Sequence, residues 1–209
     1  MSGAGKTFWT KRLAASGHPQ VGCDDEIEQR LKSRLAAGGY SGIHGVAAWM
    51  GWPDSPTYAE RESEYLAEEI AVLDEVLSKL EGDRARDLIL DTTGSVIHCG
   101  NSILMRLRRQ MTVVYLAASP VEQQLLIERY LTDPKPVLWR GAFQPKQGET
   151  PRETVARCYP SLIAARRQSY EALAHRTVPV ADLQTLARAA SESDSAAAFL
   201  KRIQPGEGR

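Results

Sequence analysis

The sequence predicts an α/β fold in which a parallel sheet carries helices on both faces. Strand-like and helix-like segments alternate along the chain, an order typical of such folds. Residues 88–90 and 111–116 are continuous apolar runs, as expected for buried parallel strands, whereas half-exposed strands alternate polar and apolar side chains. Ligands of these folds bind outside the carboxyl ends of the strands, so the residues that follow each strand are the first candidates for function.

Composition limits the domain organisation and the partners. A chain of 209 residues fits one domain, which we expect to span residues 1–209. Its 26 basic and 26 acidic residues cancel, so no overall field attracts nucleic acid or an anionic membrane. The three cysteines form no close pair, and we expect neither a membrane span nor a leader, which predicts a reduced, cytoplasmic setting. Composition leaves the oligomeric state open.

Residues 1–7, M-S-G-A-G-K-T, match a phosphate-binding loop of the form G-x-x-x-x-G-K-[ST] except for its first glycine. The two glycines allow backbone N–H groups to point at phosphate oxygens, and the helix predicted over residues 8–15 directs its positive end to the same place. Lys6 is expected to contact the β- and γ-phosphates, and the Thr7 hydroxyl to bind Mg²⁺. A flexible glycine-rich N-terminus is the alternative. The candidate ATP-binding residues are Gly3, Ala4, Gly5, Lys6 and Thr7.

A phosphate loop normally follows a buried strand, and this sequence has no room for one before Met1. Two explanations stay open. Either the start of the chain is assigned too late, or the strand has been lost. The loss of a strand would leave a gap in the sheet, so we expect a parallel sheet whose first strand is missing.

A second candidate site follows the short strand predicted for residues 18–23. Asp24 and Asp25 stand at its end, directly before a helix predicted for residues 25–37, where a ligand is well placed. Asp25 is equally well explained as a helix cap. The helix prediction rests on a four-residue apolar spacing, and a glycine pair ends it. The apolar residues are Ile27, Leu31 and Leu35.

Residues 38–60 are expected to form a region that caps the substrate. Its glycines and prolines surround two tryptophans, which suits a short helix and a shaped loop, although an aromatic plug over the core explains them as well. The longest helical signal follows over residues 57–80. Asp91 ends the strand at 88–90, where nucleotide phosphotransferases place a group that holds Mg²⁺ or its water. The alternative is that Asp91 caps the turn that follows.

The second half of the chain continues the alternation. The predicted elements are helices over residues 102–110, 119–130, 151–175 and 191–203 and strands over 111–116 and 177–180. Residues 132–150 are basic and broken by prolines, and such a long excursion inside a compact domain predicts a lid. Residues 187–198 are expected to be weakly constrained.

Five short motifs carry more information together than any one of them alone. They are residues 3–7 (G-A-G-K-T), 24–28 (D-D-E-I-E), 92–96 (T-T-G-S-V) and 135–138 (K-P-V-L), and Arg166 with Tyr170. In order and approximate spacing they resemble the shikimate kinase family, small kinases of the nucleoside-monophosphate-kinase-like group of P-loop proteins. The resemblance covers most of the chain. It implies a three-layer P-loop kinase fold, ATP and Mg²⁺ as cofactors, and transfer of the γ-phosphoryl group to a hydroxyl of a small metabolite.

The resemblance also implies roles for single residues. Asp24 is similar to the family's aspartate that contacts the acceptor hydroxyl as a base or orienting group. Lys135 occupies the place of the lid arginine that neutralises the transferring phosphate. Gly94 resembles the last glycine of the substrate turn, and Arg166 the arginine that grips the substrate carboxylate. Arg129 lies near the place of the arginine that stacks on adenine.

The departures from the family pattern concern the acceptor. Gly22 stands where the family has a second carboxylate, and Tyr58 with Ala59 stands where it has a Phe-Arg pair, so Arg61 is the remaining candidate for a second substrate-binding arginine. Thr93 is a further candidate for substrate binding, because it belongs to the substrate turn, residues 92–94, in which threonines replace two of the family's three glycines. A bidentate arginine clamp is hard to replace with alanine, so the predicted acceptor is a small hydroxyl compound other than shikimate.

Two other functions are compatible with the sequence. A nucleotide-binding protein without kinase activity would explain the incomplete loop and the absent carboxylate at Gly22. A nucleoside monophosphate kinase would share the same architecture.

Overall fold

The computed structural model describes residues 3–82, 87–189 and 191–204, and the four strands in this part of the chain are all paired in parallel. Strand β1 (Gln20–Gly22) pairs with β2 (Ile89–Asp91), and β3 (Val114–Ala117) pairs with β4 (Arg176–Pro179). The two pairs are separate two-stranded sheets. This arrangement confirms the predicted parallel α/β fold and the expected gap in its sheet.

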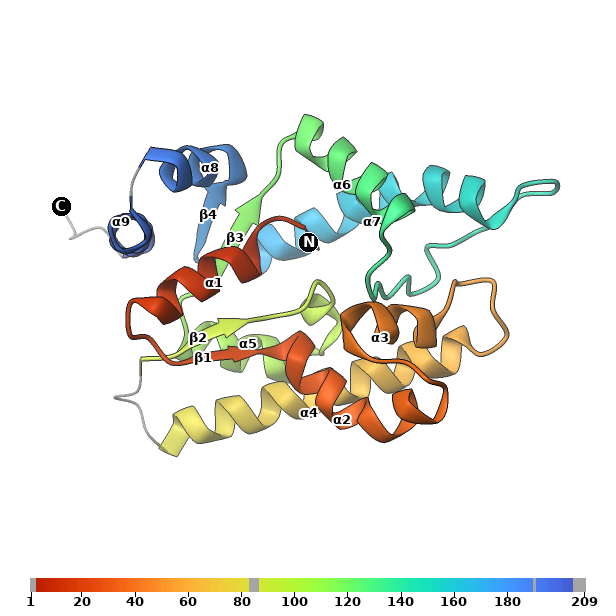
Figure 1. Cartoon of the computed structure of the whole chain (residues 1–209), viewed down its shortest axis with the longest axis horizontal. Coiled ribbons are helices and arrows are strands. Elements are labelled where there is room, and N and C mark those ends of the chain that lie inside the picture. The colour runs from red at the N-terminus through yellow and green to blue at the C-terminus, as the bar shows by residue number, and fades with distance from the viewer. Residues whose placement is uncertain (1–2, 83–86, 190, 205–209) are drawn as a thin grey trace.

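Helices surround the two strand pairs (Figure 1). Helix α1 crosses the space between the pairs and packs against β1, β2 and the last helix. The helices are α1 (Lys6–Ala15), α2 (Cys23–Ala37), α3 (Gly42–Met50), α4 (Tyr58–Gly82), the short 3₁₀ helix η1 (Val96–His98), α5 (Asn101–Gln110), α6 (Pro120–Thr132), α7 (Pro151–Leu173), α8 (Val180–Ala189) and α9 (Glu192–Ile203).

Local sequence signals explain where several helices begin. Ser119 and Thr150 each cap a helix by accepting a hydrogen bond from the backbone N–H three residues later. The glutamate at that position accepts a second hydrogen bond from the N–H of the capping residue. Proline occupies the first helical position in both cases, where its missing N–H costs nothing. The four-residue apolar spacing predicted for α2 is confirmed, because Ile27, Leu31 and Leu35 are all buried.

The C-terminal segment differs from the sequence-based expectation. Helix α8 was not predicted, and residues 187–198, expected to be weakly constrained, include two fully buried side chains, Ser195 and Ala196. Their small size lets α9 approach α1, where the ring of Phe199 stacks on Trp9 at a centroid distance of 5.1 Å. Ser195 also accepts a 2.6 Å hydrogen bond from Arg12. The low complexity of this segment therefore reflects close packing.

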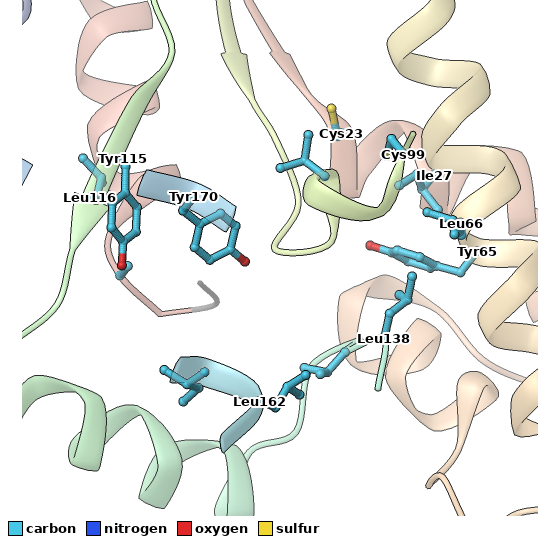
Figure 2. Close-up of a cluster of buried hydrophobic side chains, with 14 of the residues drawn as sticks. Cys23, Ile27, Tyr65, Leu66, Cys99, Tyr115, Leu116, Leu138, Leu162 and Tyr170 are labelled. Atoms are coloured by element: carbon cyan, nitrogen blue, oxygen red, sulfur yellow. The ribbon is translucent and has the colours of Figure 1, made fainter. Parts of the chain in front are cut away.

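The buried apolar side chains form one cluster that extends across both strand pairs, part of which is drawn in Figure 2. Strand β3 begins at Val114 and is shorter than the predicted run from residue 111. Among the helices that the structure describes, none has the length and apolar character needed to cross a membrane.

Candidate functional site

The phosphate loop adopts a backbone that its glycines make possible. Gly3 and Gly5 have φ angles of 79° and 89°, in the left-handed region that other residues rarely adopt. A Cβ atom on Gly3 would lie 2.8 Å from Leu126 Cδ2, so a side chain there would also clash with α6. Gly5 caps α1 without a side-chain hydrogen bond, which leaves the first N–H groups of α1 available to an anion.

Thr7 and Asp91 meet at the carboxyl end of β2. The Thr7 hydroxyl donates a 2.8 Å hydrogen bond to Asp91 Oδ2, and Thr10 makes a longer one of 3.5 Å to the same atom. Asp91 Oδ1 is buried and, within the described residues, has no hydrogen-bond partner. A hydroxyl and a carboxylate with a spare oxygen suit Mg²⁺, which prefers oxygen ligands and usually takes one or two from the protein and the rest from phosphates and water.

Asp24 lies in the first turn of α2, directly after β1, and is partly buried. Its Oδ1 accepts a 2.9 Å hydrogen bond from the Tyr65 hydroxyl. Burial raises the pKa of Asp24, while the positive charge of Lys6 and the Tyr65 hydrogen bond act in the opposite direction. Asp25, by contrast, is exposed in the same helical turn.

A small cavity of about 40 Å³ brings together five residues that the sequence singled out. It lies where the phosphate loop, the start of α2, the turn after β2, residues 135–137 and α7 converge. Two lysines and an arginine face one carboxylate there, a balance that favours an anionic ligand. The five predicted residues in its lining are Lys6, Asp24, Gly94, Lys135 and Arg166.

Arg166 is 7% exposed and fastens two segments of the site to α7. Its Nη1 donates a 3.2 Å hydrogen bond to the Gly94 carbonyl, and its Nη2 donates to the Leu138 carbonyl. The Tyr170 hydroxyl also donates to Gly94. Within the described residues the buried Nε of Arg166 has no hydrogen-bond partner. The side chain is thus committed largely to backbone carbonyls.

A buried carboxylate that the sequence analysis missed supports the turn after β2. Glu69, on α4, is fully buried and accepts hydrogen bonds from the hydroxyls of Thr93 and Ser95. The Ser95 N–H donates a further 2.9 Å hydrogen bond to Thr93 Oγ1. Burial raises the pKa of Glu69 to about 7, although the two hydroxyl donors lower it. The predicted substrate residue Thr93 therefore already has a partner inside the protein.

A second missed carboxylate, Glu62, helps to anchor the middle of the segment predicted as a lid. Glu62 is buried and accepts a 2.9 Å hydrogen bond from the Arg140 N–H. The hydroxyl of Tyr58 lies 3.0 Å from Glu62 Oε1 and 2.7 Å from the Val137 carbonyl, and it accepts a bond from the Trp139 N–H. Residues 137–139 are buried, so this part of the segment is packed into the core.

Glu62 and Glu69 left a signal in the sequence. The two glutamates lie seven residues apart within the apolar stripe of α4, at positions where a helix buries its side chains. A carboxylate at such a position is rarely buried unless it has partners, so it marks a polar network.

The other two arginines of interest lie apart from this cavity. Arg129 is exposed on α6, and its Nη1 lies 3.6 Å from the position that a Cβ on Gly3 would occupy, so it borders the phosphate loop. Arg61 donates to the Trp49 carbonyl, and its guanidinium lies 5.6 Å from the centroid of the Trp49 ring. Arg61 is therefore engaged elsewhere and does not line the cavity.

The chain is similar in structure to solved shikimate kinases. Against the shikimate kinase from Acinetobacter baumannii, solved in complex with shikimate, it has a TM-score of 0.57 at 24% identity, covering 96% of this chain and 87% of that one. Against the shikimate kinase from Bacteroides thetaiotaomicron the TM-score is 0.51 at 18% identity, covering 90% and 94%. No protein-family model matches the sequence, and no curated protein matches it. The likeness confirms what the motifs suggested about architecture: the chain has the P-loop kinase fold of the shikimate kinases.

Proposed function

We propose that this protein is an ATP-dependent phosphotransferase that moves the γ-phosphoryl group to a hydroxyl of a small, anionic metabolite. The observation that carries the proposal is the cavity whose lining includes both Lys6, next to the glycines of the phosphate loop, and Asp24, in the first turn of α2. A cation for the phosphates and a carboxylate for the acceptor hydroxyl are the two groups that such a transfer needs side by side. The P-loop kinase fold supports the same reaction class.

In this proposal the residues act mainly by position and charge. The phosphate loop, residues 3–7, holds the ATP phosphates with backbone N–H groups and Lys6. Thr7 and Asp91 hold Mg²⁺, which when bound neutralises charge on the β- and γ-phosphates. Asp24 orients the acceptor hydroxyl and accepts its proton, and Lys135 stabilises the charge of the transferring group. Arg129, at the edge of the loop, is left to contact the adenine.

The acceptor site is assigned to the same cavity. Its lining contributes three positive side chains, Lys6, Lys135 and Arg166, so an acceptor with a negative group is favoured. Residues 38–60 and 132–150, which contribute Ile43, Lys135, Pro136 and Val137 to its lining, are proposed to close over the acceptor. The commitment of Arg61 to Trp49 removes the candidate for a second clamp, which supports an acceptor other than shikimate.

The test begins with binding. Mg-ATP and Mg-ADP are titrated calorimetrically into the parent chain, Lys6→Ala and the control Lys11→Ala, which alters an exposed lysine on the same helix. We expect the parent and the control to bind with micromolar dissociation constants and Lys6→Ala to lose binding at least about tenfold while keeping its circular dichroism spectrum.

Turnover then separates the alternatives. ADP formation is measured with a panel of hydroxy acids, including shikimate, with polyols and with nucleoside monophosphates. The proposal predicts ADP formation with a hydroxy acid and its loss in Lys6→Ala. ATP binding with no ADP formed for any acceptor would identify a binding protein instead, and a preference for nucleotides would identify a nucleoside monophosphate kinase.

A further inference from the structure

A groove of about 400 Å³ at the amino ends of β3 and β4 has no part in the reaction proposed above. We call it the basic groove. Its lining includes Arg108 and Arg109 in the last turn of α5, Thr112 before β3, and His175 and Arg176 at the start of β4. Among the residues that the structure describes, no aspartate or glutamate lines it. The groove shares no lining residue with the acceptor cavity, so a ligand bound in it would not displace the acceptor.

Arg108 is fixed at the basic groove by uncharged partners. Its Nη1 donates hydrogen bonds of 2.9, 2.5 and 3.4 Å to the carbonyls of Ala172, Leu173 and Ala174, at the C-terminal end of α7. An arginine in this position complements the partial negative charge of the helix end. That role occupies Nη1 alone, because Nε and Nη2 have no hydrogen-bond partner within the described residues. Arg108 therefore keeps N–H donors for a ligand.

Arg176 and His175 are also held by the backbone. Arg176 Nη1 donates a 3.0 Å hydrogen bond to the His175 carbonyl, and in the described part of the chain no carboxylate pairs with Arg176. His175 Nδ1 accepts a 3.0 Å hydrogen bond from the Val113 N–H, so the proton of the neutral ring is on Nε2. The exposed imidazole thus offers a donor whose orientation is fixed.

Thr112 and Arg109 add donors at the exposed side of the basic groove. Neither the hydroxyl nor the N–H of Thr112 has a partner within residues 3–82, 87–189 and 191–204. Arg109 lies 3.5 Å from Glu81, measured from Nη2 to Oε1. The same carboxylate oxygen lies 3.1 Å from Arg106 Nε. Because Glu81 is shared between two arginines, it neutralises Arg109 only in part.

The partners of these arginines differ from those of other arginines in the chain. Many of the others are paired with carboxylates, among them Arg30, Arg106, Arg157, Arg167 and Arg202. Arg108 and Arg176 are bonded to carbonyl oxygens, which carry no formal charge. The basic groove therefore holds positive charge that the described residues do not neutralise. Since the chain as a whole has equal numbers of basic and acidic residues, this local excess is not a consequence of a basic composition.

We propose that the basic groove binds the phosphate group of a phosphorylated small molecule. Guanidinium groups bind phosphate oxygens through pairs of parallel N–H donors, and arginine is preferred wherever this geometry is needed. A phosphate monoester, with up to two negative charges and three acceptor oxygens, uses more of the donors of the groove than a carboxylate does. The headgroup of a membrane lipid carries a phosphate ester too, and the test distinguishes the two sources. The proposal does not depend on kinase activity.

Nuclear magnetic resonance reads the basic groove separately from the phosphate loop, which can also bind phosphate. The isotope-labelled full chain is titrated with glycerol 3-phosphate to about 10 mM, and with glycerol as the uncharged control. Amide shifts of Thr112, Val113 and Arg176 report on the groove, and those of Gly5 and Thr7 report on the loop. A result at the groove is therefore independent of any binding at the loop.

We expect the three groove amides to shift saturably with glycerol 3-phosphate, with a dissociation constant of about 1 mM or below, and not with glycerol. The double variant Arg109→Met and Arg176→Met keeps the apolar stems and leaves Arg108 in place at the end of α7. We expect it to bind at least about tenfold more weakly. The charge-keeping pair Arg109→Lys and Arg176→Lys should recover most of the affinity. Arg152→Met, which alters an exposed arginine in the first turn of α7, is the matched control.

The proposal is overturned if the groove amides do not shift saturably. It is also overturned if the double methionine variant, with the circular dichroism spectrum of the parent, binds as tightly as Arg152→Met. Sedimentation with phosphatidylglycerol vesicles then identifies the source of the phosphate. If the parent sediments with the vesicles and the double methionine variant does not, the groove binds a lipid headgroup. Any other sedimentation result assigns it to a free phosphorylated metabolite.

Discussion

The hydroxyl of Thr7 and the carboxylate of Asp91 lie 2.8 Å apart although 84 positions separate them in the sequence. This contact joins the first turn of α1 to the last residue of β2. It places the two oxygen-bearing groups proposed to hold Mg²⁺ in contact before any ligand enters. Folding has therefore already brought the two groups together. Binding of Mg²⁺ then requires only that the Thr7 hydroxyl and the Asp91 carboxylate turn toward the metal.

Replacing Asp91 with asparagine tests the metal assignment. Asn keeps the shape and can still accept from Thr7, but it removes the negative charge. We expect Asp91→Asn to lower turnover about 10²-fold or more and to raise the Mg²⁺ concentration needed for half-maximal rate. The control is Asp87→Asn, which alters the carboxylate at the other end of the same strand run. An unchanged Mg²⁺ dependence in Asp91→Asn would contradict the assignment.

The role of the Thr7 hydroxyl is tested by two substitutions of similar size. Thr7→Ser keeps the hydroxyl, and Thr7→Val keeps the branched shape without it. We expect Thr7→Ser to stay within about threefold of the parent in kcat/KM and Thr7→Val to lose about 10²-fold. If Thr7→Val were as active as Thr7→Ser at saturating ATP and Mg²⁺, the hydroxyl would not be needed and the assignment would be wrong.

The pair of Tyr65 and Asp24 predicts a change in the pH profile. The Tyr65 hydrogen bond lowers the pKa of Asp24, which burial raises, so Tyr65→Phe raises that pKa further. Because the proposed base works as the carboxylate, we expect the acidic limb of kcat/KM to move up by about 0.5–1 pH unit. Tyr115→Phe, which removes a hydroxyl on β3, is the control and leaves the limb in place. A limb that shifts down or stays in Tyr65→Phe speaks against Asp24 as the base.

Sequence patterns predicted much of the fold because the relevant signals are local. The apolar spacing of α2, the cap at Ser119 and the polar residues Asp24 and Asp91 after strands are all properties of short segments. Helix α8 was not predicted because it starts at Val180 directly after a strand, with no capping residue in the sequence to mark its start. The partners of side chains in the tertiary structure could not be predicted for a different reason.

Glu69 illustrates that reason. Its location on an apolar helix stripe is visible in the sequence, but its partners Thr93 and Ser95 lie 24 and 26 positions away. Likewise nothing local to Arg166 indicates that it holds the carbonyls of Gly94 and Leu138. The family resemblance implied that Gly94 and Arg166 contact the substrate. The packing of α4 and α7 against the turn after β2 shows which groups these residues contact within the protein.

The buried Glu69 predicts a pH-dependent stability. Its pKa is raised from 4.5 to about 7, so the folded state holds a proton that the unfolded state releases. Stability linked to Glu69 is thus fully present below about pH 4.5 and is lost as the pH rises through 7, a change on the order of 3 kcal/mol. Urea unfolding of the parent and Glu69→Gln at pH 5 and pH 8 measures it. We expect the parent to lose more stability than the variant over this range, and parallel losses would refute the linkage.

Replacement of Arg166 tests whether this residue has a structural role, a substrate-binding role or both. Arg166→Met keeps the length and the apolar stem but removes the donors to Gly94 and Leu138, which we expect to lower the free energy of unfolding by about 3 kcal/mol. Arg167→Met is the control, because Arg167 is exposed and its partner is Glu171 in the next turn, a pair worth less than about 1 kcal/mol.

The activity of Arg166→Met is measured well below its Tm, so that loss of folded protein does not affect the rate. If Arg166 also binds the acceptor, its replacement raises KM for the acceptor by about tenfold or more at that temperature, while KM for ATP stays the same. An unchanged acceptor KM would leave Arg166 with a structural role only, as a brace between α7, the turn after β2 and residues 137–139.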